Sequence, residues 1–431
     1  MRKAFGLGAV LVLCSALAAG SAPAGVGTGS DPAGVGARAV TLKFATYAWQ
    51  PTTVAATKNI VASWNRSHPG VRVEIVSVDP NSVHDKLLTN FVGGTAADVI
   101  HDEAADIAGF TQQGYLANLA PLLPRSLKSS IPKHIWDTVR IGGRITGVPS
   151  LLQTYNIFAN MTILKRAGIK APTLRDPWTW KEFRANAKKL TNSSRYGVCW
   201  GLRSPTAALQ TMALNYGGQF FYRRGGKWTF RWGAAEQNVP RQVHDMIHVD
   251  KSVDPAATGL SGTAVLPAFF GGKCAMTVQG NFQAQGMILQ GPREFSWAMF
   301  PVLKGTSQNQ VANPQTFSIA QQSKNKRAAM QFIAYLLNAQ NMAKLAQGDW
   351  LIPSNPRAGQ IARRSTKHAG SWRVATSSVV HFRKGNWVLL TDYPRWKAEV
   401  AQSNFVQYLA GRMSLSDLGR ALSDGWERVS D

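Results

Sequence analysis

Three short strand patterns alternate with two helix patterns between residues 40 and 103, and this order restricts the fold more than any other feature of the chain. Residues 40–49, 71–76 and 97–103 have the apolar alternation or short apolar runs of strands. Residues 53–66 and 82–92 have helical periodicity, and Gly93-Gly94 stops the second helix. Short links between such elements predict a parallel, doubly wound sheet.

This sheet predicts where a ligand binds. Ligands of open α/β sheets lie beyond the carboxyl ends of the strands. The segments that follow two of these ends contain Trp49 and Gln50 after the first strand, and Asp102 and Glu103 after the third. We therefore expect an aromatic ring, an amide and two carboxyl groups to face one crevice.

The remaining chain is long enough for a second lobe, which we expect to begin near residue 155. Thr179-Trp180-Lys181-Glu182 has the spacing of a capping box and predicts a helix through about Leu190. Apolar periodicity predicts further helices over 207–216, 326–347 and 415–429, and Gly348 is expected to end the second of these. With 431 residues, 45% of them hydrophobic, two lobes are the natural expectation.

The first 20 residues have the features of an export signal. Arg2 and Lys3 precede an apolar stretch that is too short to span a bilayer. Two endings are compatible with it: cleavage after Ala16-Leu17-Ala18, or lipid attachment at Cys14 in Leu-Val-Leu-Cys. Residues 21–38, rich in Gly, Ala and Pro, are expected to form a flexible tether.

The chain is strongly basic, with a formal net charge of +25. Such a charge is compatible with nucleic acid, an anionic surface, an anionic ligand or an acidic habitat. The basic residues are scattered, however, and no nucleic-acid-binding motif is present. We therefore expect no nucleic-acid partner.

Motifs for catalysis and metal binding are weak. There is no Gly-x-Ser-x-Gly, His-Glu-x-x-His or Walker motif, so no enzyme activity and no cofactor are expected. His244 and His248 are four residues apart, but two histidines without further ligands are more often solvated than metal-bound. An exported Cys199 and Cys274 are compatible with one disulfide, although two buried thiols are favoured.

Aromatic side chains recur beside polar ones at expected strand ends. A sugar offers C–H faces for aromatic rings and hydroxyl groups that need hydrogen-bond partners, so this pattern favours a carbohydrate ligand. The pairs involve Trp49, Gln153 with Tyr155, Trp200, Asn281 with Phe282, and Trp350.

Seven motifs in order resemble the extracellular solute-binding protein family 1 of ABC importers. They are Phe91–Gly94 with Ala97–Ile100, Gly114–Leu119, Gly143–Pro149, Tyr155-Asn156, Ala167–Ile169 with Trp178–Phe183, Phe269–Phe282 and Ser323–Ala329. The resemblance covers about residues 40–350. It implies an α/β, two-lobed periplasmic-binding-protein fold of the class II type, in which each lobe is a doubly wound sheet and a hinge joins the lobes.

The resemblance also implies boundaries and partners. We expect one lobe from 39–152 plus about 312–347, and another from about 155–308 plus 350–431, with crossings near 152–156, 308–314 and 345–351. A carbohydrate is expected to bind between the lobes, and a membrane permease to receive it from a monomeric protein. Attachment to the cell membrane through Cys14 and release as a free exported protein both remain open.

The expected ligand contacts combine both lines of argument. The stacking rings are Trp49, Tyr155, Trp200, Phe282 and Trp350, and the polar partners are Gln50, Asp102, Glu103, Gln153, Asn281 and Asn313, while Gly280 is expected to let the backbone approach the ligand. A glycerol-phosphate or other anionic solute, motivated by the high positive charge, and an exported carbohydrate-active enzyme are the alternatives. A lysine or arginine in the cleft would favour the anionic solute.

Overall fold

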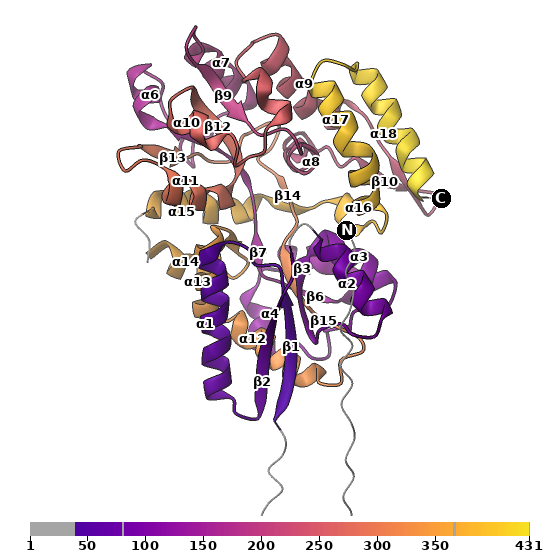
Figure 1. The fold of residues 1–431 in the computed structure, drawn as a ribbon. Coiled ribbons are helices and arrows are strands. Elements are labelled where there is room, and N and C mark those ends of the chain that lie inside the picture. The colour runs from indigo at the N-terminus through magenta and orange to yellow at the C-terminus, as the bar shows by residue number, and fades with distance from the viewer. Residues whose placement is uncertain (1–38, 80–81, 365–367, 431) are drawn as a thin grey trace, which may run out of the picture. The chain divides into compact units, whose positions relative to one another are not determined.

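Two mixed β-sheets organise the chain in a computed structural model, which describes residues 39–79, 82–364 and 368–430. The first has the order β2-β1-β3-β15-β6 and the second the order β13-β8-β12-β9 (Figure 1). The expected export signal, the lipid attachment at Cys14 and the tether lie outside the described residues. Within these residues, no helix has the length and apolarity needed to cross a membrane.

The first sheet confirms the parallel arrangement expected for residues 40–103. Its strands are β1 (Val40–Thr46), β2 (Val71–Ser77), β3 (Val99–Glu103), β6 (Gly147–Pro149) and β15 (Gln315–Ile319). Strand β1 pairs in parallel with β2 and β3. Strand β15 pairs antiparallel with β3 and β6, so the sheet is mixed rather than wholly parallel.

Helices cover both faces of this sheet because side chains alternate along its strands. Phe44 of β1 lies in the core that includes Trp64 of α1 (Pro51–Ser67) and Phe332 of α12 (Lys326–Leu336). The next residue, Ala45, belongs to a separate cluster with Leu87 of α2 (Val83–Val92) and Ile107 of α3 (Ala104–Gln112). Figure 1 shows α1 on one side of the sheet and α2 and α3 on the other.

The second sheet is built from strands that lie between residues 155 and 299. Its strands are β8 (Tyr155–Asn160), β9 (Tyr196–Trp200), β12 (Cys274–Gly280) and β13 (Trp297–Met299). The helices between them in sequence are α6 (Met161–Arg166), α7 (Trp180–Leu190), α8 (Thr206–Ala213), α9 (Ala234–His248), α10 (Leu266–Phe270) and α11 (Ala284–Gln290). The capping box confirms the start of α7, since Thr179 accepts a hydrogen bond from the Glu182 backbone and the Glu182 side chain accepts from Thr179.

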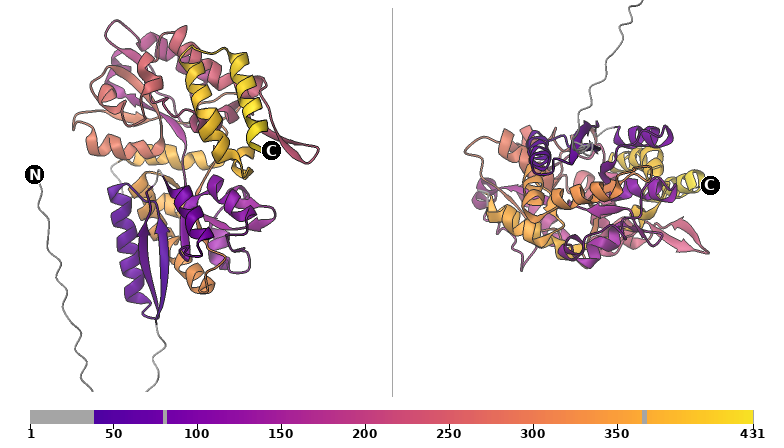
Figure 2. Two further views of the ribbon diagram at one scale, coloured as in Figure 1. Left: turned by 45° about the vertical axis from the view of Figure 1, so that its right-hand side comes forward. Right: turned by 90° about the horizontal axis from the view of Figure 1, so that it is seen from below.

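Smaller elements complete the fold. The short strands are β4 (Arg140–Ile141), β5 (Arg144–Ile145), β7 (Leu151–Leu152), β10 (Phe221–Arg224), β11 (Lys227–Phe230), β14 (Gln310–Ala312), β16 (Ile352–Pro353) and β17 (Phe382–Lys384). The remaining helices are α4 (Arg125–Ser130), α5 (Lys133–Trp136), α13 (Ala339–Asp349), α14 (Pro356–Arg364), α15 (Ala369–Ser377), α16 (Tyr393–Trp396), α17 (Gln402–Leu409) and α18 (Leu415–Ser430). The last two pack side by side in every view (Figures 1 and 2).

One expected helix is divided. The periodic stretch 326–347 forms α12 and α13, which are separated at Leu337-Asn338. The Asn338 side chain accepts a hydrogen bond from the Asn341 backbone and so caps a new helix. Gly348 is consequently not a C-cap but lies inside α13, where a Cβ would come within 2.7 Å of the Thr53 hydroxyl; Trp350 ends the helix in the left-handed conformation.

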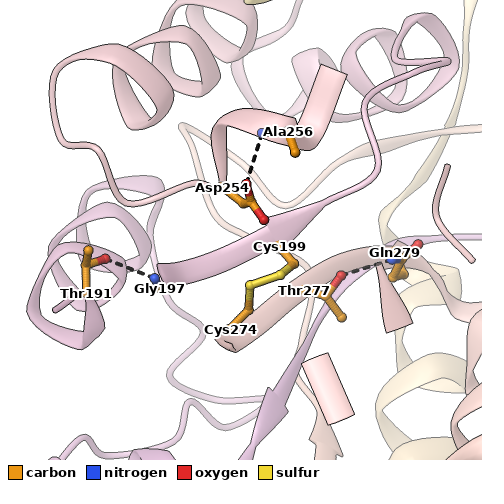
Figure 3. The surroundings of a disulfide bond; sticks show 8 residues. All are labelled: Thr191, Gly197, Cys199, Asp254, Ala256, Cys274, Thr277 and Gln279. Atoms are coloured by element: carbon orange, nitrogen blue, oxygen red, sulfur yellow. Dashed lines mark hydrogen bonds between the residues drawn. A yellow bond between two sulfur atoms is a disulfide. The ribbon is translucent and has the colours of Figure 1, made fainter. Parts of the chain in front are cut away.

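The two cysteines form a disulfide, which corrects the preference for two buried thiols. Cys199 of β9 and Cys274 of β12 lie on neighbouring strands with their Cα atoms 5.5 Å apart (Figure 3). This separation lies within the range for disulfide-bonded cysteines. Asp254 lies beside the pair, but the two sulfur atoms are bonded to each other and so are not available as thiolate ligands for a metal.

Candidate ligand-binding site

A cavity of about 350 Å³ lies beyond the carboxyl ends of β1 and β3, where the sheet order places a ligand. It is lined by the segment between β1 and α1, by residues of α2, β3, α3, β15 and α13, and by residues that follow β7, β12 and α13. Six of the predicted ligand contacts are among them: Trp49, Gln50, Asp102, Glu103, Gln153 and Phe282. Parts of the chain that are up to 300 residues apart in sequence therefore meet at this cavity.

A second cavity of about 610 Å³ adjoins the first. The two share Glu103, Asp106 and Gln153, and Asn313, another predicted contact, lines the second. Both volumes fall in the range of about 300–1,000 Å³ that is usual for small-molecule sites. Asn313 also holds Glu103 in place, because its side-chain amide donates a 2.7 Å hydrogen bond to the Glu103 carboxyl group.

Aromatic rings are available on the cavity surface. Trp49 is 57% exposed, which is unusual for the largest apolar side chain. Phe282 lines the same cavity and packs over Gly280, where a Cβ would lie 2.2 Å from the phenyl ring. A side chain at position 280 would therefore clash with the ring of Phe282, and the expected approach of a ligand to the Gly280 backbone stays a prediction.

Four carboxyl groups line the first cavity: Asp102, Glu103, Asp106 and Asp349. Burial, and next the charge of Asp106, raise the pKa of Glu103 to about 7. Burial likewise raises the pKa of Asp349 to about 6. Burial and the charge of Asp106 raise the pKa of Asp102 well above its usual range. The site therefore holds protons at pH values where ordinary carboxyl groups have lost them.

The partners of these carboxyl groups are incomplete. One oxygen of Asp102 accepts the backbone N–H of Glu103 at 2.8 Å, whereas its Oδ2 is buried and has no hydrogen-bond partner. Asp349 accepts the hydroxyl group of Thr53. Lys397, on the wall of the second cavity, partly offsets the rise in the pKa of Glu103 and of Asp106 by its positive charge. It is the one lysine or arginine among the described residues that line either cavity.

A stack of rings supports the cavity floor. Tyr47 packs on His101 with ring centroids 4.4 Å apart, and His101 packs in turn on Phe317 at 4.6 Å. The imidazole is fixed by Thr46 at 2.9 Å and by Gln315 at 3.2 Å. The hydroxyl group of Tyr47 is buried without a partner, so a second polar atom on this wall is unsatisfied.

Five predicted contacts, Gly280 among them, do not line either cavity. Trp200 and Trp350 are 2% and 3% exposed, and Trp350 stacks on Trp372 at 4.6 Å, so both rings belong to the core. Asn281 is fully buried and bonds to the backbone of Thr154 and of Trp350, which gives it a structural role. Tyr155 is half-buried, and its backbone pairs with the side chain of Gln310.

Several cavity residues were absent from the prediction. Asp106 lies one helical turn after Glu103, and this spacing could have identified it. Tyr47 directly follows β1 in the same segment as Trp49, whereas Gln315 and Asp349 reach the cavity only through the pairing of β15 with β3 and the contact of α13 with α1. No local sequence signal marks Gln315 and Asp349 as neighbours of this segment.

The two histidines considered as metal ligands have packing partners instead. His244 stacks on Tyr408 with centroids 4.7 Å apart, and the Nε2 of His248 bonds to the Leu409 carbonyl at 2.9 Å. Both therefore fasten α9 to α17. The expectation that they do not bind a metal remains a prediction.

Comparisons with known proteins agree with this architecture. Residues 48–343 match the family of bacterial extracellular solute-binding proteins. An uncharacterised lipoprotein of Streptomyces antibioticus, encoded in the oleD 5' region, is 40% identical over 387 residues, which are 89% of this chain and 86% of the relative.

Solved structures share the fold at low sequence identity. The GacH receptor of Streptomyces glaucescens, solved unliganded and with acarbose, superposes with a TM-score of 0.74 at 20% identity, over 91% of this chain and 99% of the receptor. UgpB of Mycobacterium tuberculosis, in complex with glycerophosphocholine, superposes with a TM-score of 0.73 at 17% identity, over 90% and 97%. The chain therefore has the two-lobed periplasmic-binding-protein fold and belongs to the bacterial extracellular solute-binding protein family, whose members are receptors rather than enzymes.

Proposed function

We propose that the protein captures a carbohydrate outside the cytoplasm and delivers it to the permease of an ABC importer. The observation that carries this proposal is the exposed ring of Trp49, beside Phe282, on a cavity lined with hydrogen-bonding side chains. Aromatic rings match the C–H faces of a sugar. Gln50, Gln153 and Gln315 supply both donors and acceptors for its hydroxyl groups.

Closure of the two lobes around the sugar is part of this proposal. The lobes would be 39–152 plus about 312–347, and about 155–308 plus 350–431. Strand β14 pairs with β17, whereas β15, which follows after two residues, joins the first sheet, so the chain changes sheets there. Asn281 bonds to Thr154 and Trp350, which lie at two further predicted crossings. Hinges of this kind lie in short connections between rigid elements.

The charge of the cavity disfavours the anionic alternative. A glycerol-phosphate or another anion requires nearby cations, and no described lysine or arginine lines the first cavity. Lys397 lines the second cavity together with Glu103 and Asp106, which outnumber it. A neutral or positively charged solute fits this wall better.

Membrane attachment is proposed through Cys14. The relative from Streptomyces antibioticus is described as a lipoprotein. Substitution Cys14→Ala should move the protein from the membrane fraction to the medium or the periplasm, and an unchanged membrane fraction would exclude a lipid on this cysteine.

A thermal-shift screen tests the carbohydrate proposal. The panel contains monosaccharides, disaccharides, oligosaccharides, polyols and sugar phosphates. A ligand at a hundredfold excess over its Kd stabilises the native state by about 2.7 kcal/mol. For a sugar that binds, Trp49→Ala should weaken binding by about fivefold or more without lowering stability, because an aromatic pair contributes on the order of 1 kcal/mol beyond buried area. Trp350→Ala is the matched control, since that core ring should affect stability instead. Binding of sugar phosphates alone would reject a neutral carbohydrate.

A further inference from the structure

The cavity has the opposite charge from the rest of the chain. The protein has 48 lysine and arginine residues and 23 acidic ones. Four of these 23 acidic residues line the first cavity, whereas one of the 48 basic residues lines the second and none lines the first within the described chain. Random placement would favour basic side chains by about two to one. Carboxyl groups are therefore more frequent at the cavity, relative to basic side chains, than the overall composition predicts.

We propose that the solute carries a protonated amino group, as an amino sugar or an oligosaccharide containing one does. This inference rests on the proposed carbohydrate function and specifies the chemical class of the ligand. The amino group would bind at the wall formed by Asp102, Glu103 and Asp106. The sugar ring would lie toward Trp49 and Phe282, which line the same cavity.

Unsatisfied buried atoms support a positively charged group at this wall. The Oδ2 atom of Asp102 has no partner although the residue is 0% exposed, and the hydroxyl group of Tyr47 also lacks one. A buried carboxyl oxygen without a partner is costly. An ammonium group brings several N–H donors and a positive charge. A neutral hydroxyl group brings one donor and no positive charge.

The mutual repulsion of the carboxyl groups supports the same conclusion. Burial, and next the charges of Glu103, Asp102, Asp349 and Asp106, raise the pKa of Tyr47, which lines the same cavity. After burial, the charge of Asp106 is the next cause that raises the pKa of both Asp102 and Glu103. Lys397 is the one described cation on the cavity walls that counteracts this repulsion. A bound ammonium group would add a second positive charge beside these carboxyl groups.

Paired probes test the inference by isothermal titration calorimetry on the protein. Each amino sugar is compared with its hydroxyl counterpart: glucosamine with glucose, galactosamine with galactose, trehalosamine with trehalose, and chitosan trisaccharide with cellotriose. Spermidine is the amine without a sugar ring. We expect at least one amino sugar to bind about tenfold or more tightly than its counterpart, as a charge-assisted contact implies.

Two variants connect this preference to the wall. Asp106→Asn and Glu103→Gln should each weaken binding of the amino form about tenfold more than they weaken binding of the neutral counterpart. Glu427→Gln, at an exposed position of α18, is the control and should change neither affinity.

The outcomes distinguish a failure of the amino-sugar inference from a failure of the proposed carbohydrate function. Equal or tighter binding of the neutral counterparts, or a preference that survives both variants, overturns the amine and leaves the carbohydrate receptor standing. Binding of spermidine without any sugar supports the amine and overturns the carbohydrate. If no probe binds, the amino-sugar inference is rejected.

Discussion

The buried Glu103 carboxyl group should make stability depend on pH in a defined direction. Burial, followed by the charge of Asp106, raises its pKa from an ordinary 4.5 to about 7. Between these two values the folded protein holds a proton that the unfolded chain has released. Stability therefore falls as pH rises through this window, because the native state binds more protons than the unfolded state. Each unit of pKa shift corresponds to about 1.4 kcal/mol, so the loss attributable to Glu103 is about 3 kcal/mol.

Glu103→Gln isolates this contribution. The amide is uncharged at every pH and can still accept the hydrogen bond from Asn313. Wild type and variant should have similar stability near pH 4, and the variant should become more stable by about 3 kcal/mol above pH 8. The other titrating groups of the site, among them Asp102, Asp106, Asp349 and the histidines, are present in both proteins, so the difference between the curves reports on position 103.

Urea unfolding between pH 4 and pH 8.5 measures this difference. The exposed Glu427→Gln variant should follow the wild-type curve throughout. Parallel curves for wild type and Glu103→Gln would refute the reasoning, because they would show that Glu103 titrates alike in the folded and unfolded states. A variant that loses stability relative to wild type as pH rises would refute it more strongly, since the sign would be reversed.

Two further predictions concern packing and cross-linking. Cys199→Ala combined with Cys274→Ala should lower the free energy of unfolding by about 4 kcal/mol, because the disulfide closes a loop of 75 residues. In urea unfolding, a reductant should destabilise the wild type and leave the double variant unchanged. Equal responses of the two proteins to the reductant would contradict the pairing. Gly197→Ala should cost about 1–3 kcal/mol, since its Cβ would lie 2.1 Å from the Ala187 carbonyl oxygen. Gly259→Ala, whose Cβ would meet nothing within 4 Å, is the control, and a comparable loss in both variants would exclude the clash as the cause.

Local sequence signals correctly predicted those elements whose bounds depend on local residues alone. The capping box at Thr179 placed the start of α7, and apolar periodicity carried it to Leu190 as observed. The same periodicity failed over 326–347, because the apolar stripe continues across the break at Leu337-Asn338. There the competing signal was the capping side chain of Asn338, which is local but weaker than the hydrophobic pattern.

The candidate site likewise contains residues that the sequence placed correctly and residues that it did not. Strand order predicted that Trp49, Asp102 and Glu103 meet, because the carboxyl ends of parallel strands share one edge. The pairing of an aromatic with a polar neighbour also selected Trp200 and Trp350, which the structure buries. A short motif contains no information on which side of a strand end faces solvent, since that depends on the elements packed around it.

Charge shows most clearly why composition and site must be considered separately. The net charge of +25 motivated an anionic solute, yet the described cavity walls bear four carboxyl groups and one lysine. Exposed charges beyond about 10 Å are largely screened at 0.1 M ionic strength, whereas buried groups are screened much less. A solute in the cavity is therefore governed by Asp102, Glu103 and Asp106, and the scattered lysines and arginines on the surface act mainly on the encounter with other large molecules. The sign of the ligand's charge follows from the local arrangement of these carboxyl groups. The order of the strands brings them together, and the overall composition gives no indication of it.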